Sequence, residues 1–236
     1  MGFILRHQTN NMNKRILLAG TRPNSIGRYI GKALYDQGWD VWLYSRHAEK
    51  IENERWHERA CDITSEDEIK RLLDEIPDLE VVMFLADTGG HGALETLSES
   101  QVKGIIGSKL TGSALLCKAL FADQTKGKNI KLIWCAGKLA NKSNDLMAYA
   151  MVNAGLASFV DAVNEHNRGR FEAYYLPTPL ISPSTLGDAF IKEKGATAKA
   201  ASESPKTILD KVQNILQGRV PVGMVNPDEM EKRSMF

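Results

Sequence analysis

Three small residues, Gly20, Ser25 and Gly27, follow the apolar run 16–19. After them, apolar residues recur with the spacing of an α-helix. A buried strand that turns into a helix through such small residues forms a phosphate cradle. Glycine lets the backbone approach the ligand, and the helix N-terminus offers free N–H groups. The spacing is looser than G-x-G-x-x-G, and similar turns occur in α/β proteins that bind no nucleotide. Nucleotide binding is therefore the first hypothesis, with an ordinary strand–helix turn as its alternative.

Composition narrows the class of protein. The chain has 236 residues, a formal net charge of +1, three cysteines and five histidines. The balanced charge gives no electrostatic case for nucleic acid or for an anionic membrane. The cysteines have no C-x-x-C spacing and the histidines no metal-ligand spacing, so we expect a cytoplasmic protein without disulfides and without a metal site. No apolar run reaches the ~18 residues needed to span a bilayer.

Apolar strand patterns alternate with helical patterns along the chain. The predicted strands are 16–19, 41–44, 55–61, 81–86, 130–134, 171–176 and 220–222, and the predicted helices are 26–37, 66–75, 101–121, 147–164 and 206–217. Strands that are apolar throughout and separated by helices form a doubly wound parallel sheet covered on both faces. We predict a single-domain Rossmann-type α/β fold of about seven strands over 14–225, with a flexible extension at 1–13 and a C-terminal tail at 226–236.

This order of elements resembles the short-chain dehydrogenase/reductase family over residues 14–225. Six segments match the family's landmarks in the correct order, although each is weak alone. They are the turn Gly20…Ser25-Ile26-Gly27 (one residue longer, with Ser25 replacing a glycine), Asp62-Ile63, Ala86 in Leu85-Ala86-Asp87, Lys109-Leu110-Thr111-Gly112, Tyr149, and the segment 177–182. The resemblance implies that the turn and Ala86 border the cofactor, that Asp62 and Ile63 contact adenine, and that Pro177, Leu180 and Ser182 pack on the nicotinamide.

Charge indicates which cofactor such a site would hold. A ribose 2′-hydroxyl is usually bound by an acid at the end of the second strand, whereas a 2′-phosphate needs a cation there. Here that strand leads into Ser45 and Arg46 with no acid, and Arg22 lies in the glycine turn. Guanidinium groups bind phosphate oxygens bidentately. The sequence therefore favours NADP(H), the alternative being that both arginines are solvated surface residues.

The catalytic residues are where the resemblance breaks. The family uses a tyrosine, a lysine four residues later, a serine thirteen residues earlier and an asparagine in the preceding long helix. Here Tyr149 is kept, but Asn153 stands at the lysine position, Ala136 at the serine position and Lys109 at the asparagine position. A phenol with a pKa of ~10 is a poor base at neutral pH unless a nearby cation favours its phenolate.

Two interpretations of this exchange stay open. In the first, Lys109 and Asn153 are an exchanged pair that keeps an ammonium beside Tyr149, while Cys135, Ser182 or the substrate replaces the missing hydroxyl. The protein is then an NADP(H)-dependent carbonyl reductase or alcohol dehydrogenase. In the second, the chain is a nucleotide-binding protein without hydride transfer, such as a regulatory partner or a non-redox isomerase, dehydratase or cyclase. In either case the resemblance implies a substrate lid near 186–204 and a homodimer or homotetramer through the helices at 101–121 and 147–164.

Overall fold

The computed structural model describes residues 14–48, 50–86, 92–123, 129–137, 146–167 and 169–224; the predicted extension at 1–13 and the tail at 226–236 lie outside them. Eight strands form one sheet in the order β3-β4-β2-β1-β5-β6-β7-β8. All neighbouring pairs are parallel except β3 with β4. The strands are β1 (Arg15–Ala19), β2 (Asp40–Ser45), β3 (Ile51–Glu52), β4 (Trp56–Ala60), β5 (Val81–Phe84), β6 (Ile130–Gly137), β7 (Phe171–Thr178) and β8 (Gly223–Met224). The predicted doubly wound parallel sheet is confirmed.

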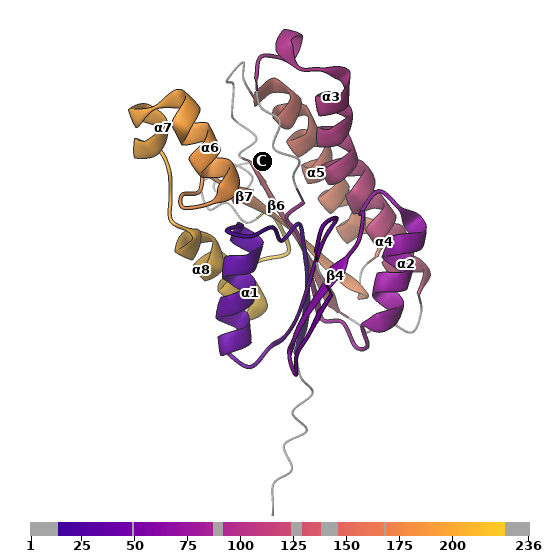
Figure 1. Cartoon of the computed structure of the whole chain (residues 1–236). Coiled ribbons are helices and arrows are strands. Elements are labelled where there is room, and N and C mark those ends of the chain that lie inside the picture. Colours follow the sequence, from indigo (N-terminus) through magenta and orange to yellow (C-terminus); the bar gives the residue numbers. More distant parts are fainter. Residues whose placement is uncertain are drawn as a thin grey trace, which may run out of the picture.

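Helices cover both faces of the sheet (Figure 1). One face carries α1 (Ile26–Asp36) and α8 (Pro205–Leu216), and the other carries α2 (Glu66–Glu75), α4 (Gly112–Ala122) and α5 (Met147–His166). Because side chains alternate along a strand, neighbours such as Leu17 and Leu18 enter opposite cores. We call these the α5-side core and the α1-side core. Both leucines are fully buried, as expected for central parallel strands.

The predicted helix at 101–121 is a continuous segment of three parts: α3 (Glu99–Ile106), the π-helical η2 (Gly107–Thr111) and α4. A 3-10 turn, η1 (Leu94–Thr96), precedes it. An 18-residue window within the segment 99–122 has a mean hydropathy of 1.3, so by length and composition this segment is apolar enough to cross a membrane, contrary to the expectation from sequence. Its residues Ile105, Leu116 and Leu120 are fully buried in the α5-side core. A core position of this kind accounts for the apolar composition.

The C-terminal third differs from the sequence-based expectation. The region near 186–204, predicted to be a substrate lid and rich in alanine and lysine, contains two helices, α6 (Thr185–Lys194) and α7 (Ala196–Ala200). Ser184 caps α6, because its hydroxyl accepts the N–H of Gly187. The strand expected at 220–222 is β8, shifted to Gly223–Met224. Figure 1 shows α6 and α7 on one side and α3 on the other, all extending beyond the carboxyl ends of the strands.

Candidate functional site

The carboxyl ends of β1 and β5 lie side by side where the strand order reverses. The chain moves outward from β1 to β2 and from β5 to β6, so this is the topological switch point at which doubly wound folds bind ligands. Gly20 follows β1 with φ +82°, and a Cβ atom there would lie 2.5 Å from Cα of Ala86. Position 20 therefore requires glycine for its backbone angle and for the close approach of the two loops.

Helix α1 begins directly after this turn. The Ser25 hydroxyl caps it by accepting the N–H of Arg28. Gly27 packs closely, since a Cβ atom there would lie 3.0 Å from Cγ2 of Thr21. An α-helix leaves the N–H groups of its first turn without intrahelical partners and carries a positive dipole end there. The N-terminus of α1, at Ser25, Ile26 and Gly27, thus fits the pyrophosphate of a dinucleotide.

The two predicted phosphate-binding arginines, Arg22 and Arg46, are both exposed. Arg22 lies in the turn before α1, and Arg46 directly follows Ser45, the last residue of β2. The Asp62 carboxylate accepts hydrogen bonds from the N–H and the hydroxyl of Thr64. These bonds lower the pKa of Asp62, and Arg46 contributes to the same effect. Arg46 therefore lies within electrostatic reach of the loop that follows β4.

Ile63, predicted to contact adenine, has a buried side chain in the α5-side core. A Cβ atom at Gly112 would lie 2.7 Å from Cγ2 of Ile63. Glycine at 112 thus lets the start of α4 approach the loop after β4. The side chain of Ile63 serves packing, and its contact with adenine stays a prediction.

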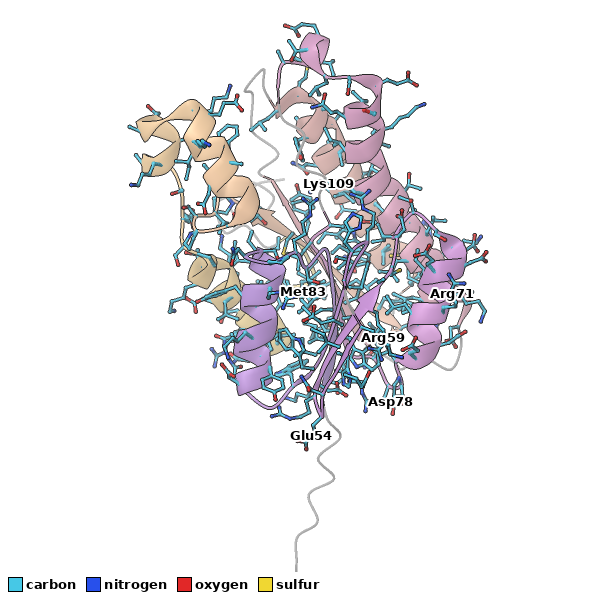
Figure 2. The ribbon with its side chains drawn as sticks, in the orientation of Figure 1. Glu54, Arg59, Arg71, Asp78, Met83 and Lys109 are labelled. Atoms are coloured by element: carbon cyan, nitrogen blue, oxygen red, sulfur yellow. The ribbon has the colours of Figure 1, made fainter. Side chains whose placement is uncertain are left out.

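Lys109 lies in the π-helical segment η2 between α3 and α4. Such turns are rare within helices and frequently occur at functional sites. The Lys109 residue is 8% exposed, and its Nζ lies 5.6 Å from the ring centroid of Tyr149, which is half-buried in the first turns of α5. Figure 2 shows Lys109 at the carboxyl end of the sheet. The structure therefore brings together the two residues to which the sequence assigned proton transfer.

Asn153 lies one turn after Tyr149 and hence on the same side of α5. It is 4% exposed, and its Oδ1 has no hydrogen-bond partner among the residues that the structure describes. Its Nδ2 packs over Gly137 at the end of β6, where a Cβ atom would lie 2.7 Å away. Buried polar atoms without a partner are rare because their desolvation is uncompensated. The Asn153 oxygen is therefore an unused hydrogen-bond acceptor on the side of α5 that carries Tyr149.

Cys135 and Ser182 stay candidates for the missing serine hydroxyl, and Cys135 borders the same small cavity as Lys109. Ala136, at the serine position, belongs to the α5-side core with Tyr149, whereas Cys135 packs against the α1-side core. Burial raises the pKa of the Cys135 thiol to about 12, although the Lys109 ammonium and a hydrogen bond with Thr178 both lower it. The Ser182 hydroxyl donates to Asp188 Oδ1 at 2.7 Å. Within the described chain, both predicted substitutes thus have other partners.

The segment predicted to pack on the nicotinamide leads from β7 toward α6. Pro177 pairs in register with Ala136 at the carboxyl ends of β7 and β6. Further on, the Leu180 carbonyl accepts the N–H of Glu203 at 2.8 Å, and the N–H of Ser182 donates to the Glu203 carbonyl at 3.0 Å. Pro177 therefore lies beside the candidate site, and Leu180 and Ser182 are held by the chain that enters α8.

A cavity of about 10 Å³ lies next to Lys109 and is bordered by Ser108, Ser113 and Trp134. This is room for a single water molecule rather than for a substrate. The loops that follow β5 and β6, residues 87–91 and 138–145, lie outside the described residues, and Asp87 of the matched segment Leu85-Ala86-Asp87 lies there too. In the described ranges, no three His, Cys, Asp or Glu side chains are arranged to hold a metal ion.

Comparison with known proteins gives structural but no sequence matches. No protein-family model and no curated protein matches the chain. Among solved structures, it is similar to a 3-ketoacyl-(acyl-carrier-protein) reductase from Brucella melitensis complexed with NADH, at 15% identity and a TM-score of 0.75, covering 89% of this chain and 94% of that one. A short-chain dehydrogenase from Burkholderia cenocepacia in complex with NADP has 16% identity, a TM-score of 0.74, and coverages of 91% and 96%.

A third similar structure is a short-chain dehydrogenase from Salmonella enterica serovar Typhi, with 17% identity, a TM-score of 0.75, and coverages of 92% and 97%. At such identities the likeness shows the fold alone. The chain has the fold of the short-chain dehydrogenase/reductase family, which confirms the resemblance at that level. The similar structures include both an NADH and an NADP complex.

Proposed function

We propose that the protein is an NADP(H)-dependent oxidoreductase of the carbonyl reductase or alcohol dehydrogenase type. Tyr149 is the proton donor, and Lys109 replaces the usual active-site lysine. The observation that carries this proposal is the position of Lys109 Nζ over the Tyr149 ring, close to the switch point of the sheet. The NADH and NADP complexes among structures of the same fold support it.

The residues have separate tasks in this reaction. When bound, the nicotinamide supplies or accepts a hydride. Tyr149 gives its hydroxyl proton to the carbonyl oxygen during reduction and takes it back during oxidation. The Lys109 ammonium favours the phenolate that is left behind, because a nearby cation stabilises the charged form of a phenol. The buried Asn153 oxygen, which has no partner in the described chain, would accept a hydrogen bond from the bound cofactor and so help to hold it.

The preference for NADP(H) over NAD(H) rests on charge. Strand β2 ends at Ser45 without an acidic residue, and the cation Arg46 follows at once. Arg22, in the glycine turn, is exposed at the same end of the sheet. Two guanidinium groups suit a 2′-phosphate, whereas a 2′-hydroxyl would call for a carboxylate.

A second candidate function is nucleotide binding without hydride transfer. The observation that favours it is the missing hydroxyl, because Ala136 stands at the serine position and packs in the α5-side core with Tyr149. A carbonyl substrate then has one fewer group to hold its oxygen. A regulatory partner or a non-redox isomerase, dehydratase or cyclase tolerates that loss.

A residue exchange tests the proposal. Lys109→Asn and Asn153→Lys are made singly and together, and NADPH oxidation is followed over a panel of aldehydes and ketones. Each single variant should lose about 100-fold or more in kcat, the usual weight of proton transfer, and the double variant should regain most of it. Lys103→Asn, at an exposed lysine of α3 that pairs with Glu99, is the control and should keep full activity. A wild type that binds NADPH yet oxidises none across the panel would support the second candidate.

The same resemblance underlies a proposal about assembly and location. We propose a homodimer or homotetramer in the cytoplasm, with the helical region 101–121, which includes α4, and α5 at the interface. Met147 and Met151 on α5 are 46% and 54% exposed, which is unusual for methionine on a helix whose other face is core. A second copy of the chain would cover these two side chains.

A further inference from the structure

The connection between β2 and β4 departs from the usual doubly wound pattern. Its described residues, 46–48 and 50–55, contain one named element, the two-residue strand β3, which pairs antiparallel with β4. A parallel crossover normally needs roughly a dozen residues or more and usually contains a helix. This connection therefore descends along the edge of the sheet and returns through a tight hairpin. The N–H of Asn53 donates to the Trp56 carbonyl at that hairpin, at 2.9 Å.

The Glu52 carboxylate joins this edge strand to β4 through side-chain hydrogen bonds. Its Oε1 lies 2.5 Å from Nδ1 of His57, and its Oε2 accepts a hydrogen bond from Nη2 of Arg59. The guanidinium of Arg59 also donates to the carbonyl of Ile51 and to Glu75 on α2. The Arg59 hydrogen bond lowers the pKa of the Glu52 carboxyl, against an opposing effect of burial. Glu52 is therefore charged at neutral pH and joined to two cation-forming side chains.

The strand β3 depends on these side-chain contacts because its own backbone pairing is short. Both residues of β3, Ile51 and Glu52, are exposed, and the strand has a single partner. A two-residue ladder is too short to be stable by itself. In contrast, Arg59 and His57 are buried side chains on β4, and both stack on Trp42 of β2. The Glu52 contacts thus tie a weak edge to a rigid part of the sheet.

Arg46 lies in the chain between the end of β2, at Ser45, and the start of this edge strand, at Ile51. The chain segment that bears Arg46 is held at one end by β2 and at the other by β3. We infer that Glu52 is a positioning residue for recognition of the cofactor's 2′-phosphate and that it acts by holding the segment of Arg46 beside the site. The inference rests on the proposed NADP(H) preference. It assigns a role in cofactor selection to a carboxylate that itself touches no phosphate.

Replacing Glu52 with a neutral residue has two opposite effects on NADPH binding, one through the lost charge and one through the position of Arg46. A carboxylate repels a phosphate, so the loss of its charge alone would tighten NADPH binding slightly. Loss of the Glu52 contacts with His57 and Arg59 instead weakens NADPH binding, because Arg46 is then held less firmly beside the site. Glu54 provides a matched control on the same hairpin, since it is exposed and no ion pair to it is found in the described ranges. Figure 2 shows Glu54 at the end of the sheet opposite to Lys109.

The experiment measures the Kd of NADPH and of NADH for the wild type, Glu52→Gln, Glu54→Gln, Arg46→Ala and the double variant Arg46→Ala/Glu52→Gln. Glu52→Gln should weaken NADPH binding by roughly fivefold, the lower end of coupling between separate sites, and leave NADH binding unchanged. Glu54→Gln should not weaken either. In the Arg46→Ala background, Glu52→Gln should have no further effect on NADPH. Glu52→Asp, which keeps the charge on a shorter side chain, should lie between Glu52→Gln and the wild type.

The outcomes separate this inference from the proposed function. Equal loss of both cofactors in Glu52→Gln, a result matching Glu54→Gln, or full additivity with Arg46→Ala would overturn the role of Glu52 alone. If Arg46→Ala leaves the ratio of the two Kd values unchanged, or the wild type binds NADPH no tighter than NADH, the proposed NADP(H) preference fails and the inference fails with it.

Discussion

The ammonium of Lys109 lies over the ring of Tyr149, with Nζ 5.6 Å from the ring centroid. A cation in this position is attracted by the ring, by about 0.5–2 kcal/mol depending on how far it is desolvated. The contact joins η2 to α5, two segments that also pack against each other in the α5-side core. An ammonium is thus kept beside the tyrosine although it comes from a different helix than the resemblance implies.

Replacement of Gly20 by alanine should abolish cofactor binding and destabilise the fold. The new Cβ would lie 2.5 Å from Cα and 2.7 Å from N of Ala86, at a φ of +82°. Backbone atoms cannot move aside as a flexible side chain can. We expect a loss of about 3 kcal/mol or more in the free energy of unfolding, measured with urea, and no detectable NADPH binding by calorimetry.

Gly38 is the matched control for that variant. It has a φ of +92°, and nothing lies within 4 Å of the position its Cβ would occupy. Gly38→Ala therefore introduces the backbone strain without the clash, and should cost about 1–2 kcal/mol while leaving NADPH affinity unchanged. Equal losses of stability in the two variants would show that the approach of β1 and β5 is not what requires glycine.

Stability should fall as the pH rises above about 8.5, the ordinary pKa of a free thiol. Burial raises the pKa of Cys61 and of Cys135 to about 12, and raises that of Cys117 further still. Between these values the unfolded chain releases thiol protons that the folded chain retains. Each such thiol then lowers the free energy of unfolding by up to about 1.4 kcal/mol per pH unit.

Urea unfolding at pH 8 and at pH 10 measures this dependence. Cys117→Ser should be less stable than the wild type at both values, because a buried residue that is 1% exposed is made more polar. Its stability should nevertheless fall less steeply with pH, since one of the retained protons is gone. A wild-type stability that is flat between the two pH values would contradict the buried, protonated thiols.

The central strands could be predicted from sequence because they are apolar throughout. β1 and β5 each lie within two residues of their predicted bounds. β3 could not be predicted, because Ile51 and Glu52 are both exposed and two residues are too few to show the apolar pattern of a strand. Their strand depends on His57 and Arg59, which follow later in the chain. Helix α6 did have a local signal, the Ser184 N-cap, which the Ala/Lys-rich composition obscured.

In the candidate site, too, some features could be predicted from sequence and others depend on packing between distant segments. Gly20 could be predicted because a strand–helix turn at a switch point needs it. Alternation along β6 also predicts that Cys135 and Ala136 pack against opposite cores, as they do. The π-helical turn at Lys109 and the unpartnered oxygen of Asn153 are products of packing between distant segments. No local pattern predicts either of them.

The proposed oligomer should dissociate when charge is placed on α5. Met151 is 54% exposed, and a dimer through α4 and α5 would bury it. Met151→Glu should therefore convert the dimer or tetramer into a smaller species, as measured by light scattering after gel filtration, because a buried unpaired carboxylate is costly. Val222→Glu, at an equally prominent residue (49% exposed) before β8, should leave the assembly intact. A monomeric wild type would contradict the proposed interface.

Replacement of Asn153 should separate stability from function. Its buried Oδ1 lacks a partner in the described part of the chain, so Asn153→Leu removes an uncompensated polar group at similar volume. We expect the free energy of unfolding without ligand to rise by about 1 kcal/mol, while NADPH affinity falls. Asn164→Leu is the control, because its amide donates to the Ala173 carbonyl and accepts from the Ala173 N–H.

In Asn164→Leu, the free energy of unfolding should fall by about 2–3 kcal/mol, because two buried backbone groups of Ala173 would be left unpaired. NADPH affinity should change little. The opposite signs of the two stability changes are the critical result. A buried polar residue kept at the expense of stability is what selection for binding leaves behind. If Asn153→Leu instead destabilises the fold as much as Asn164→Leu, then Asn153 is a structural residue, and its place in the proposed cofactor site is wrong.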